Sequence, residues 1–576
     1  MARTRWLWIS LASLVLLVGM LCARGGARLE VEPGSTLVVR VRGDYVEAAE
    51  PTLLARVLGG GPAPFARVLS QLALARRDDR LDAVVLAIED TSLGWGKAAE
   101  LRDAIGRLRA AGRRTVAYLE LDGLAVQREY WIASAADEVW VVPGGSVPLV
   151  GLAAEYLYLG DAFDKLGVDF EVAKAGRYKS AVETIAGNAM SDASREMANA
   201  LLDSTERQFV DGIARGRGLE PDAVRAAIDR APVLASELAD ARLIDGEAHL
   251  DAVLEKLGGP VVKGEEYAGI DPASVGFDPV ATYALVYGSG NVVPGDESAT
   301  PRGEPVFAAG AIREAVEKAA KDDDVDAIIV RIDSPGGSAL ASEIMWRAIS
   351  EAKRESGKPV VASFSDVAAS GGYYVASAAD SIVASGTTVT GSIGVFSLRP
   401  LLGGLLDKLG VRTELLTRGE HADFLSSTRP SSPAARERLQ SVVLDIYRLF
   451  LERVGTGRSL ATEAVDAVGQ GRVWTGEQAL ERGLVDRLGG LHEAVREANR
   501  LRGIDEDADA ILVAYPPPKP LAQELAELLN ARIAAAARAS VGLPALSGPL
   551  ATLERALASA PPLAPLLVPP AWVEIR

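Results

Sequence analysis

Cysteine and histidine are scarce in this chain of 576 residues, which contains one cysteine and three histidines. The single cysteine, Cys22, leaves no disulfide within the chain and no thiol cluster for a metal ion. The histidines are His249, His421 and His492, too few to favour a multi-histidine metal site or a Ser-His-Asp triad. We therefore expect chemistry that needs neither a metal nor a cofactor.

Basic residues are outnumbered in this chain. Its 61 lysines and arginines stand against 78 acidic residues, which gives a formal net charge of −17. A nucleic-acid partner is disfavoured, because a phosphate backbone would be repelled by such a protein. Hydrophobic residues make up 48% of the chain and charged residues 24%, which is ordinary for a globular protein with large cores.

Residues 1–28 have the pattern of a membrane anchor. Arg3 and Arg5 precede an apolar run over 6–22, which is about as long as the shortest membrane-spanning helix, roughly 17 residues. A cleavable export signal has a similar pattern, but residues 19–21 match poorly the small residues that precede a cleavage site. We favour an uncleaved signal anchor with the rest of the chain outside the cytoplasm, because positive charge precedes the run. Two further arginines beyond the run weaken that orientation.

The chain contains the same segment twice. YWIASAADEVWVV begins at Tyr130 and YYVASAADSIVAS at Tyr373, 243 positions later. LDAVVLAIED and VDAIIVRIDS, like LADARLID and ALERGLVD, recur at nearly the same spacing. Offsets that drift by only a few residues indicate a duplicated domain with short loop insertions. We divide the chain into an anchor, a first repeat, a linker, a second repeat and a Pro-rich, helical extension, at 1–28, 34–257, 258–280, 281–503 and 504–576.

Each repeat alternates short β-branched runs with longer helical patterns. Residues 327–332 are apolar on both faces, as in a buried parallel strand, and 339–355 have helical spacing. The next strand is expected over 358–365. This β-α-β order predicts an α/β fold with mainly parallel sheets. In the extension, 521–540 is an amphipathic helical pattern, and the apolar, Pro-rich end fits either a surface strap or a partner contact.

Each repeat has kept one half of a catalytic pair. The second has Ser370 in an ASGG motif, where the first has Gln127. The first has Lys179 in a GRYKS motif, where the second has Ala422. A serine without a base is a poor nucleophile, and together the two residues make a Ser/Lys dyad. Taken singly, the serine also fits an ordinary helix N-cap and the lysine an exposed surface residue.

Glycines near Ser370 are candidate oxyanion donors. The Gly371 N–H follows the serine directly, and either Gly336 or Gly337 supplies a second N–H from the DSPGGS turn after a predicted strand. A tight turn between a strand and a helix also needs glycine, so that alternative stays open. Ser392, in TGSIGVF, is placed to orient the lysine amine or else is an ordinary turn serine.

These motifs resemble the signal peptide peptidase A family in its long, tandem-domain form. The likeness spans nearly all of residues 30–505 and rests on DSPGGS, ASGGYY, TGSIGVF and GRYKSAVET, in the order expected for the duplication. It implies that Ser370 is the nucleophile, Lys179 the general base and Ser392 its assistant. The implied fold is the ββα spiral of Clp proteases and crotonases.

The resemblance also implies a setting. Members of the family are membrane-anchored in the bacterial inner membrane, face outward from the cytoplasm, form homo-tetramers in the long form and degrade signal peptides left after export. Two features depart from the family pattern. Asp333 stands where asparagine is common, which we expect to change the local charge, and the C-terminal extension has no match.

Two other functions compete with this interpretation. A crotonase-like enzyme acting on acyl-CoA thioesters would use similar oxyanion glycines, but with a glutamate as acid and base and a basic pocket for the nucleotide. A non-catalytic membrane scaffold would carry two degenerate repeats and bind through its extension.

Overall fold

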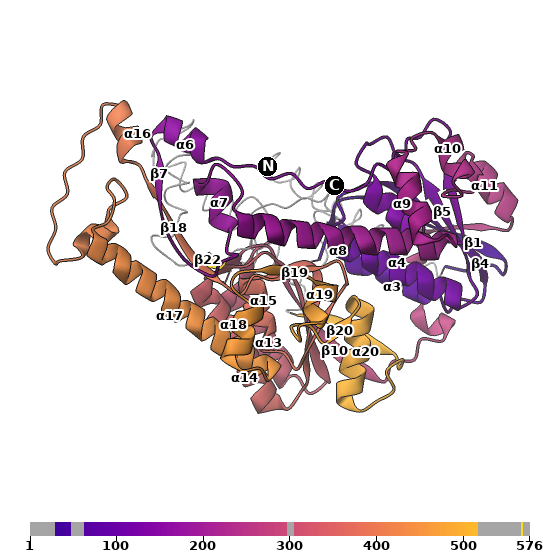
Figure 1. Cartoon of the computed structure of the whole chain (residues 1–576). Coiled ribbons are helices and arrows are strands. Elements are labelled where there is room, and N and C mark those ends of the chain that lie inside the picture. Colours follow the sequence, from indigo (N-terminus) through magenta and orange to yellow (C-terminus); the bar gives the residue numbers. More distant parts are fainter. Residues whose placement is uncertain (1–28, 48–62, 297–303, 516–565, 568–576) are drawn as a thin grey trace, which may run out of the picture.

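The computed structural model describes residues 29–47, 63–296, 304–515 and 566–567. Three large sheets and their covering helices form two lobes, with an arm that extends away from them (Figure 1). A fourth, two-stranded sheet pairs β2 (Tyr45–Val46) with β3 (Ala63–Pro64). The predicted anchor at 1–28 and the amphipathic pattern over 521–540 lie outside the described residues. Within the described ranges, no helix combines the length and the apolarity that crossing a bilayer requires.

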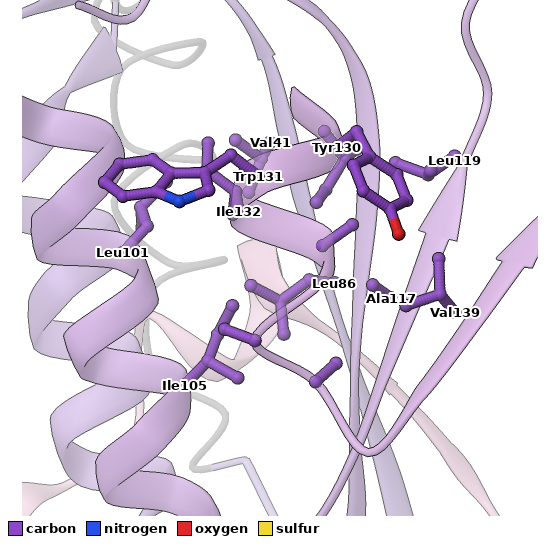
Figure 2. Packing of buried hydrophobic residues seen from close by; sticks show 14 of the residues in the cluster. Val41, Leu86, Leu101, Ile105, Ala117, Leu119, Tyr130, Trp131, Ile132 and Val139 are labelled. Carbon is purple, nitrogen blue, oxygen red and sulfur yellow. The ribbon is translucent and has the colours of Figure 1, made fainter. Parts of the chain in front are cut away.

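The first repeat is built on a sheet of six parallel strands. In spatial order these are β8 (Gly246–Glu247), β6 (Glu138–Val141), β5 (Arg114–Leu119), β4 (Leu81–Thr91), β1 (Ser35–Gly43) and β9 (Val261–Lys263). β1 and β4 are long β-branched runs that are buried on both faces, as helices on both sides of a parallel sheet require. Leu101 and Ile105 of the covering helix α4 (Trp95–Ala110) pack against Leu86 of β4 and the neighbouring strands (Figure 2).

The second repeat is built on a sheet of the same design. Its strands are β20 (Arg487–Leu488), β16 (Ser381–Ala384), β15 (Val360–Ala369), β13 (Ala327–Ser334), β10 (Ala281–Ser289) and β21 (Ala510–Tyr515). They are parallel, and the order matches that of the first repeat strand for strand. The far half of β15 also pairs with β17 (Val389–Gly391), which pairs antiparallel with β19 (Val473–Thr475). The α/β class with mainly parallel sheets is therefore confirmed.

The helices follow the duplication as well. Those of the first repeat and the segment after it are α3 (Phe65–Ala75), α5 (Gln127–Ala133), α6 (Gly160–Leu166), α7 (Ala181–Ala186), α8 (Asp192–Arg217), α9 (Pro221–Asp229), α10 (Ala235–Asp240), α11 (Leu250–Leu257), α12 (Gly264–Tyr267) and the 3₁₀ turn η1 (Pro272–Val275). Those of the second are α13 (Ala309–Lys321), α14 (Ala339–Ser356), α15 (Gly371–Ala376), α16 (Gly403–Lys408), η2 (Ala422–Leu425), α17 (Pro433–Arg458), α18 (Thr462–Val468), α19 (Gly476–Leu480) and α20 (Leu491–Arg502).

The helices α8 and α17 are the two longest in the described part of the chain and occupy corresponding places after the arm. Each is 26 residues long and begins at a serine whose side chain accepts from the backbone N–H three residues on, Ser191 for α8 and Ser432 for α17. α8 crosses from the first repeat to the second (Figure 1), where the Ser204 and Thr475 hydroxyls lie 2.9 Å apart. The two repeats are thus packed against each other as well as joined in sequence.

A third sheet contains strands of both repeats. Its order is β12 (Phe307–Ala308), β11 (Val292–Val293), β14 (Gly337–Ser338), β22 (Leu566–Leu567), β18 (Val395–Leu401) and β7 (Asp169–Ala175). β7 of the first repeat and β18 of the second pair antiparallel over seven residues and form the arm (Figure 1). Because β7 ends just before Lys179 and β18 begins just after Ser392, this pairing brings the two loops together.

Three strand positions extend the pattern read from the sequence. The strand expected over 358–365 continues to residue 369, directly before Ser370. The segment 258–280 contains β9, which pairs with β1 of the first sheet. The segment 504–576 contains β21, which is the edge strand of the second sheet. Within that segment, residues 516–565 and 568–576 lie outside the described residues.

Candidate active site

Ser370 stands at a sharp turn from strand to helix. It follows β15 and precedes α15, with backbone φ 53° and ψ −112°. Positive φ is strained for a non-glycine residue, and such strain is typical of functional sites. Its N–H donates to Gly391 O at 2.8 Å, and its side chain makes no capping hydrogen bond. The ordinary N-cap alternative therefore does not describe this serine.

The loop that carries Lys179 rests on the second repeat. The Tyr178 N–H donates to Gln470 O at 2.7 Å. At two positions only glycine fits. A Cβ on Gly176 (φ +111°) would lie 2.6 Å from the Gln470 carbonyl, and one on Gly471 (φ +76°) would lie 2.6 Å from the Lys179 backbone nitrogen. The lysine of one repeat is thus positioned by direct backbone contact with the other.

Lys179 and Ser370 meet within one chain. The amine Nζ lies 2.8 Å from Ser370 Oγ, 2.9 Å from Ser392 Oγ and 3.1 Å from the Ser392 carbonyl oxygen. All three residues are fully buried. Burial away from water holds the pKa of Lys179 well below its ordinary value. A neutral amine has two N–H donors for the two Ser392 oxygens, which leaves its lone pair facing the Ser370 hydroxyl.

Ser392 is anchored by the same segment that anchors the lysine loop. Its backbone has φ 53°, and its N–H donates to Arg472 O at 2.7 Å. Residues 470–472 therefore contact both the loop of Lys179 and the loop of Ser392. Because one short segment anchors both loops, its backbone sets how far apart the loops of Lys179 and Ser392 lie.

The glycine turn after β13 lies against the start of α15. A Cβ on Gly371 would lie 3.1 Å from the Gly337 nitrogen and 3.2 Å from the Gly336 Cα, so the two backbones approach closely. Within the turn, the Gly336 N–H donates to Ser334 Oγ at 3.1 Å. Of the two glycines proposed from the sequence, Gly336 already has a partner, whereas Gly337 lies beside Gly371.

The first repeat has no such arrangement at its corresponding turn. Gln127 begins α5 and donates from Nε2 to the Pro148 carbonyl oxygen at 3.1 Å. Pro148 is the first residue of the stretch that corresponds to the Ser392 loop. The amide therefore links the two loops that Lys179 links in the second repeat, and this turn supplies no nucleophile.

Two contributors to the site escape sequence reading. Gly471 belongs to an unremarkable GQGR stretch, and only its closeness to Lys179 distinguishes it. The second is Lys97 of the first repeat, whose Nζ lies 2.6 Å from Asp333 Oδ2 and 2.6 Å from Asp366 Oδ2. The charge change expected from Asp333 is thus balanced by a lysine 236 positions away. No local pattern could have paired them.

Comparison with known proteins agrees with the duplication. Residues 108–259 and 352–505 each match the family model described as Peptidase family S49. The chain is 33% identical over 498 residues to the chloroplastic serine protease SPPA of Arabidopsis thaliana, covering 84% of this chain and 71% of that protein. It is 31% identical over 454 residues to Protease 4 of Salmonella typhi, covering 75% and 71% respectively.

Among solved structures, the 1510-N membrane-bound stomatin-specific protease aligns with 15% identity and a TM-score of 0.27, covering 41% of this chain and 99% of that chain.

Proposed function

Because this chain belongs to peptidase family S49, a family of serine proteases, we propose that Ser370 is its nucleophile and Lys179 its general base. The observation that carries the proposal is the 2.8 Å separation between Lys179 Nζ and Ser370 Oγ in a fully buried setting. A lysine acts as a base only when its pKa is strongly lowered, and burial lowers the pKa of this one.

The mechanism is acyl transfer through a covalent intermediate. Neutral Lys179 takes the proton of the Ser370 hydroxyl as its oxygen attacks the peptide carbonyl. The Gly371 and Gly337 N–H groups stabilise the oxyanion of the tetrahedral intermediate. The protonated lysine then gives its proton to the leaving amine, and a water molecule repeats the sequence to release the acyl group. Ser392 orients the amine by accepting its N–H bonds, so that the lone pair points at Ser370.

The peptide binds as an added strand between β14 and β18. Support comes from the chain itself, because Leu566 and Leu567 already pair antiparallel with Gly337 and Ser338 of β14 and with Phe396 of β18. An extended segment at this position runs past the proposed oxyanion donor Gly337. Strand addition supplies affinity through backbone hydrogen bonds, while pockets for alternate side chains supply specificity.

The substrates are hydrophobic peptides. Phe396 belongs to an apolar cluster with Ala181 and Val182, which lie just beyond Lys179. A small cavity beside Ser180 is lined by Tyr156, Tyr158, Met190, Met197 and Leu201, and also by Glu183 and Thr184. These mostly apolar surroundings of the lysine loop favour apolar substrate side chains.

We further propose the setting that the sequence indicates. An anchor at residues 1–28 holds the enzyme in the bacterial inner membrane, with both repeats on the outer side, and remnant signal peptides released by export are the natural substrates. The active assembly is a homo-tetramer, and each repeat has the ββα spiral of Clp proteases. The acyl-CoA and scaffold alternatives are both disfavoured by membership in a serine protease family.

The test is turnover of a fluorogenic apolar peptide by the full-length protein in detergent. Wild type should cleave it, and Ser370→Ala and Lys179→Ala should each abolish cleavage while the thermal unfolding midpoint stays near or above that of wild type. Lys174→Ala is the matched control, since it removes an exposed lysine five residues away. Full activity of Lys179→Ala at neutral pH would contradict the proposed base.

A further inference from the structure

A second buried lysine of the first repeat lies beside the catalytic elements of the second. Lys97 is in the first turn of α4, and its side chain is only 5% exposed. Its ammonium group contacts three carboxylates, with Nζ 2.6 Å from Asp333, 2.6 Å from Asp366 and 3.3 Å from Glu47. Its backbone N–H also donates to Asp366 Oδ1 at 2.9 Å. The proposed reaction uses none of these groups directly.

The two aspartates adjoin the parts that the reaction needs. Asp333 lies near the end of β13 and directly precedes the turn that carries Gly337, while Asp366 lies four residues before Ser370 on β15. Asp333 Oδ1 also accepts from the Val367 N–H at 3.2 Å, across the point where the register of β13 and β15 shifts. Lys97 thus joins the oxyanion turn to the nucleophile strand where ladder pairing is interrupted.

The segment before Lys97 is shaped for this contact. A Cβ on Gly94 would lie 2.3 Å from the Asp366 carboxyl carbon, and one on Gly96 would lie 2.4 Å from the Ser365 carbonyl oxygen. Between them, the Trp95 carbonyl accepts from the Thr387 hydroxyl at 2.8 Å. This segment corresponds to the DSPGGS turn of the second repeat. Having lost the paired glycines of an oxyanion turn, it now packs against the nucleophile strand of its sister repeat.

The negative charges around Lys97 make its ammonium group necessary for that packing. Among the described residues, the cluster contains the carboxylates of Glu47, Glu100, Asp333 and Asp366 and two cations, Lys97 and Arg331. Arg331 pairs with Glu47 and Glu100. Without the ammonium group, Asp333 and Asp366 would face each other with no cation between them. Partly buried carboxylates so placed repel each other or take up a proton, and either change loosens the link between turn and strand.

We propose that Lys97 is a positioning residue for catalysis, which holds the turn of Gly337 and the strand of Ser370 in the relative geometry that oxyanion stabilisation requires. This inference rests on the proposed function. The first repeat then contributes twice to the active site, with Lys179 as the base and Lys97 as the clamp on the elements that carry the nucleophile and the oxyanion donors.

The test compares three variants of the full-length protein with wild type. Lys97→Met should lower kcat by about 10- to 100-fold with KM nearly unchanged, since removing one oxyanion donor outright costs about 10²- to 10³-fold in kcat. Lys97→Met/Asp333→Asn removes the unpaired charge and should recover much of that loss. Lys353→Met is the control, because it removes an ion pair with Asp380 elsewhere in the second repeat and should leave kcat unchanged.

Two results would overturn the inference. One is an unchanged kcat in Lys97→Met. The other is a fall in kcat that the added Asp333→Asn change does not relieve and that merely parallels the fraction of folded protein measured by thermal unfolding. If Lys97→Met does not fold, the double variant still decides: its kcat should lie within a few-fold of wild type, and a kcat lowered about 100-fold in its folded form would contradict the proposed role of the charge. Failure of the proposed function can be told apart from failure of this inference. If the proposed function were wrong, a fluorophosphonate would not label Ser370 even in the wild-type protein.

Discussion

Replacing Gly471 by alanine tests whether the backbone of the second repeat sets the position of the lysine. The added methyl group would lie 2.6 Å from the Lys179 nitrogen and 2.7 Å from its Cα and Cβ, whereas ordinary contacts begin at 3.4 Å. Relieving the overlap needs a shift of about 0.8 Å, which is a large change for an amine that must reach a hydroxyl. A misplacement of about 1 Å can cost roughly 100-fold in rate, so we expect kcat to fall by about 10- to 100-fold.

A matched control separates this displacement from backbone strain. Gly471 has φ +76°, and an alanine in the left-handed region costs about 1–2 kcal/mol of stability whatever its neighbours. Gly503 has φ +73° and nothing within 4 Å of its added Cβ. Gly503→Ala should therefore lose only the stability that the strained backbone costs, about 1–2 kcal/mol, and keep wild-type kcat on the fluorogenic peptide. Equal kcat values for the two variants would refute the argument that Gly471 positions Lys179.

Three further outcomes follow from the same contacts. Lys179→Met should raise the free energy of unfolding at neutral pH although it abolishes turnover. Because the folded pKa of Lys179 is lowered, the unfolded chain binds more protons between that folded pKa and about pH 10.4. Wild-type stability should therefore rise with pH across this window, and the advantage of the variant should shrink in thermal melts. Protonation of the Lys179 amine removes the base, so kcat/KM of wild type should fall as pH decreases through the folded pKa of Lys179. A pH profile of kcat/KM without this fall at low pH would count against a neutral amine. Ending the chain after Tyr515 removes Leu566 and Leu567 from their place beside β14, so KM should fall severalfold at unchanged kcat, while an unchanged KM would mean that they do not compete with substrate.

The sequence predicts the fold and the catalytic pair because both leave repeated, local traces. The recurring segments at Tyr130 and Tyr373 give the duplication, and β-branched runs such as 327–332 give strands in the order the structure shows. The loss of serine from one copy and lysine from the other identifies Ser370 and Lys179 as partners, and their side chains do lie in contact.

The remaining parts of the site depend on packing between the repeats. Gly471 matters because the lysine loop of the other repeat passes within van der Waals range, and nothing in its own neighbourhood reports this. Lys97 and Asp333 each look like ordinary surface charges, yet folding buries the lysine and brings its amine into contact with the aspartate. The choice between Gly336 and Gly337 likewise needs the hydrogen bond from the Gly336 N–H to Ser334.

The central claim is that Lys179 activates Ser370, and covalent labelling tests it most directly. Full-length wild type and Lys179→Met are treated with a fluorophosphonate at neutral pH, and intact-mass and peptide mass spectrometry then locate and quantify the adduct. We predict a single adduct on Ser370 in wild type and almost none in the folded lysine variant. Labelling of a different serine, or equal labelling of Ser370 without the lysine, would contradict the account.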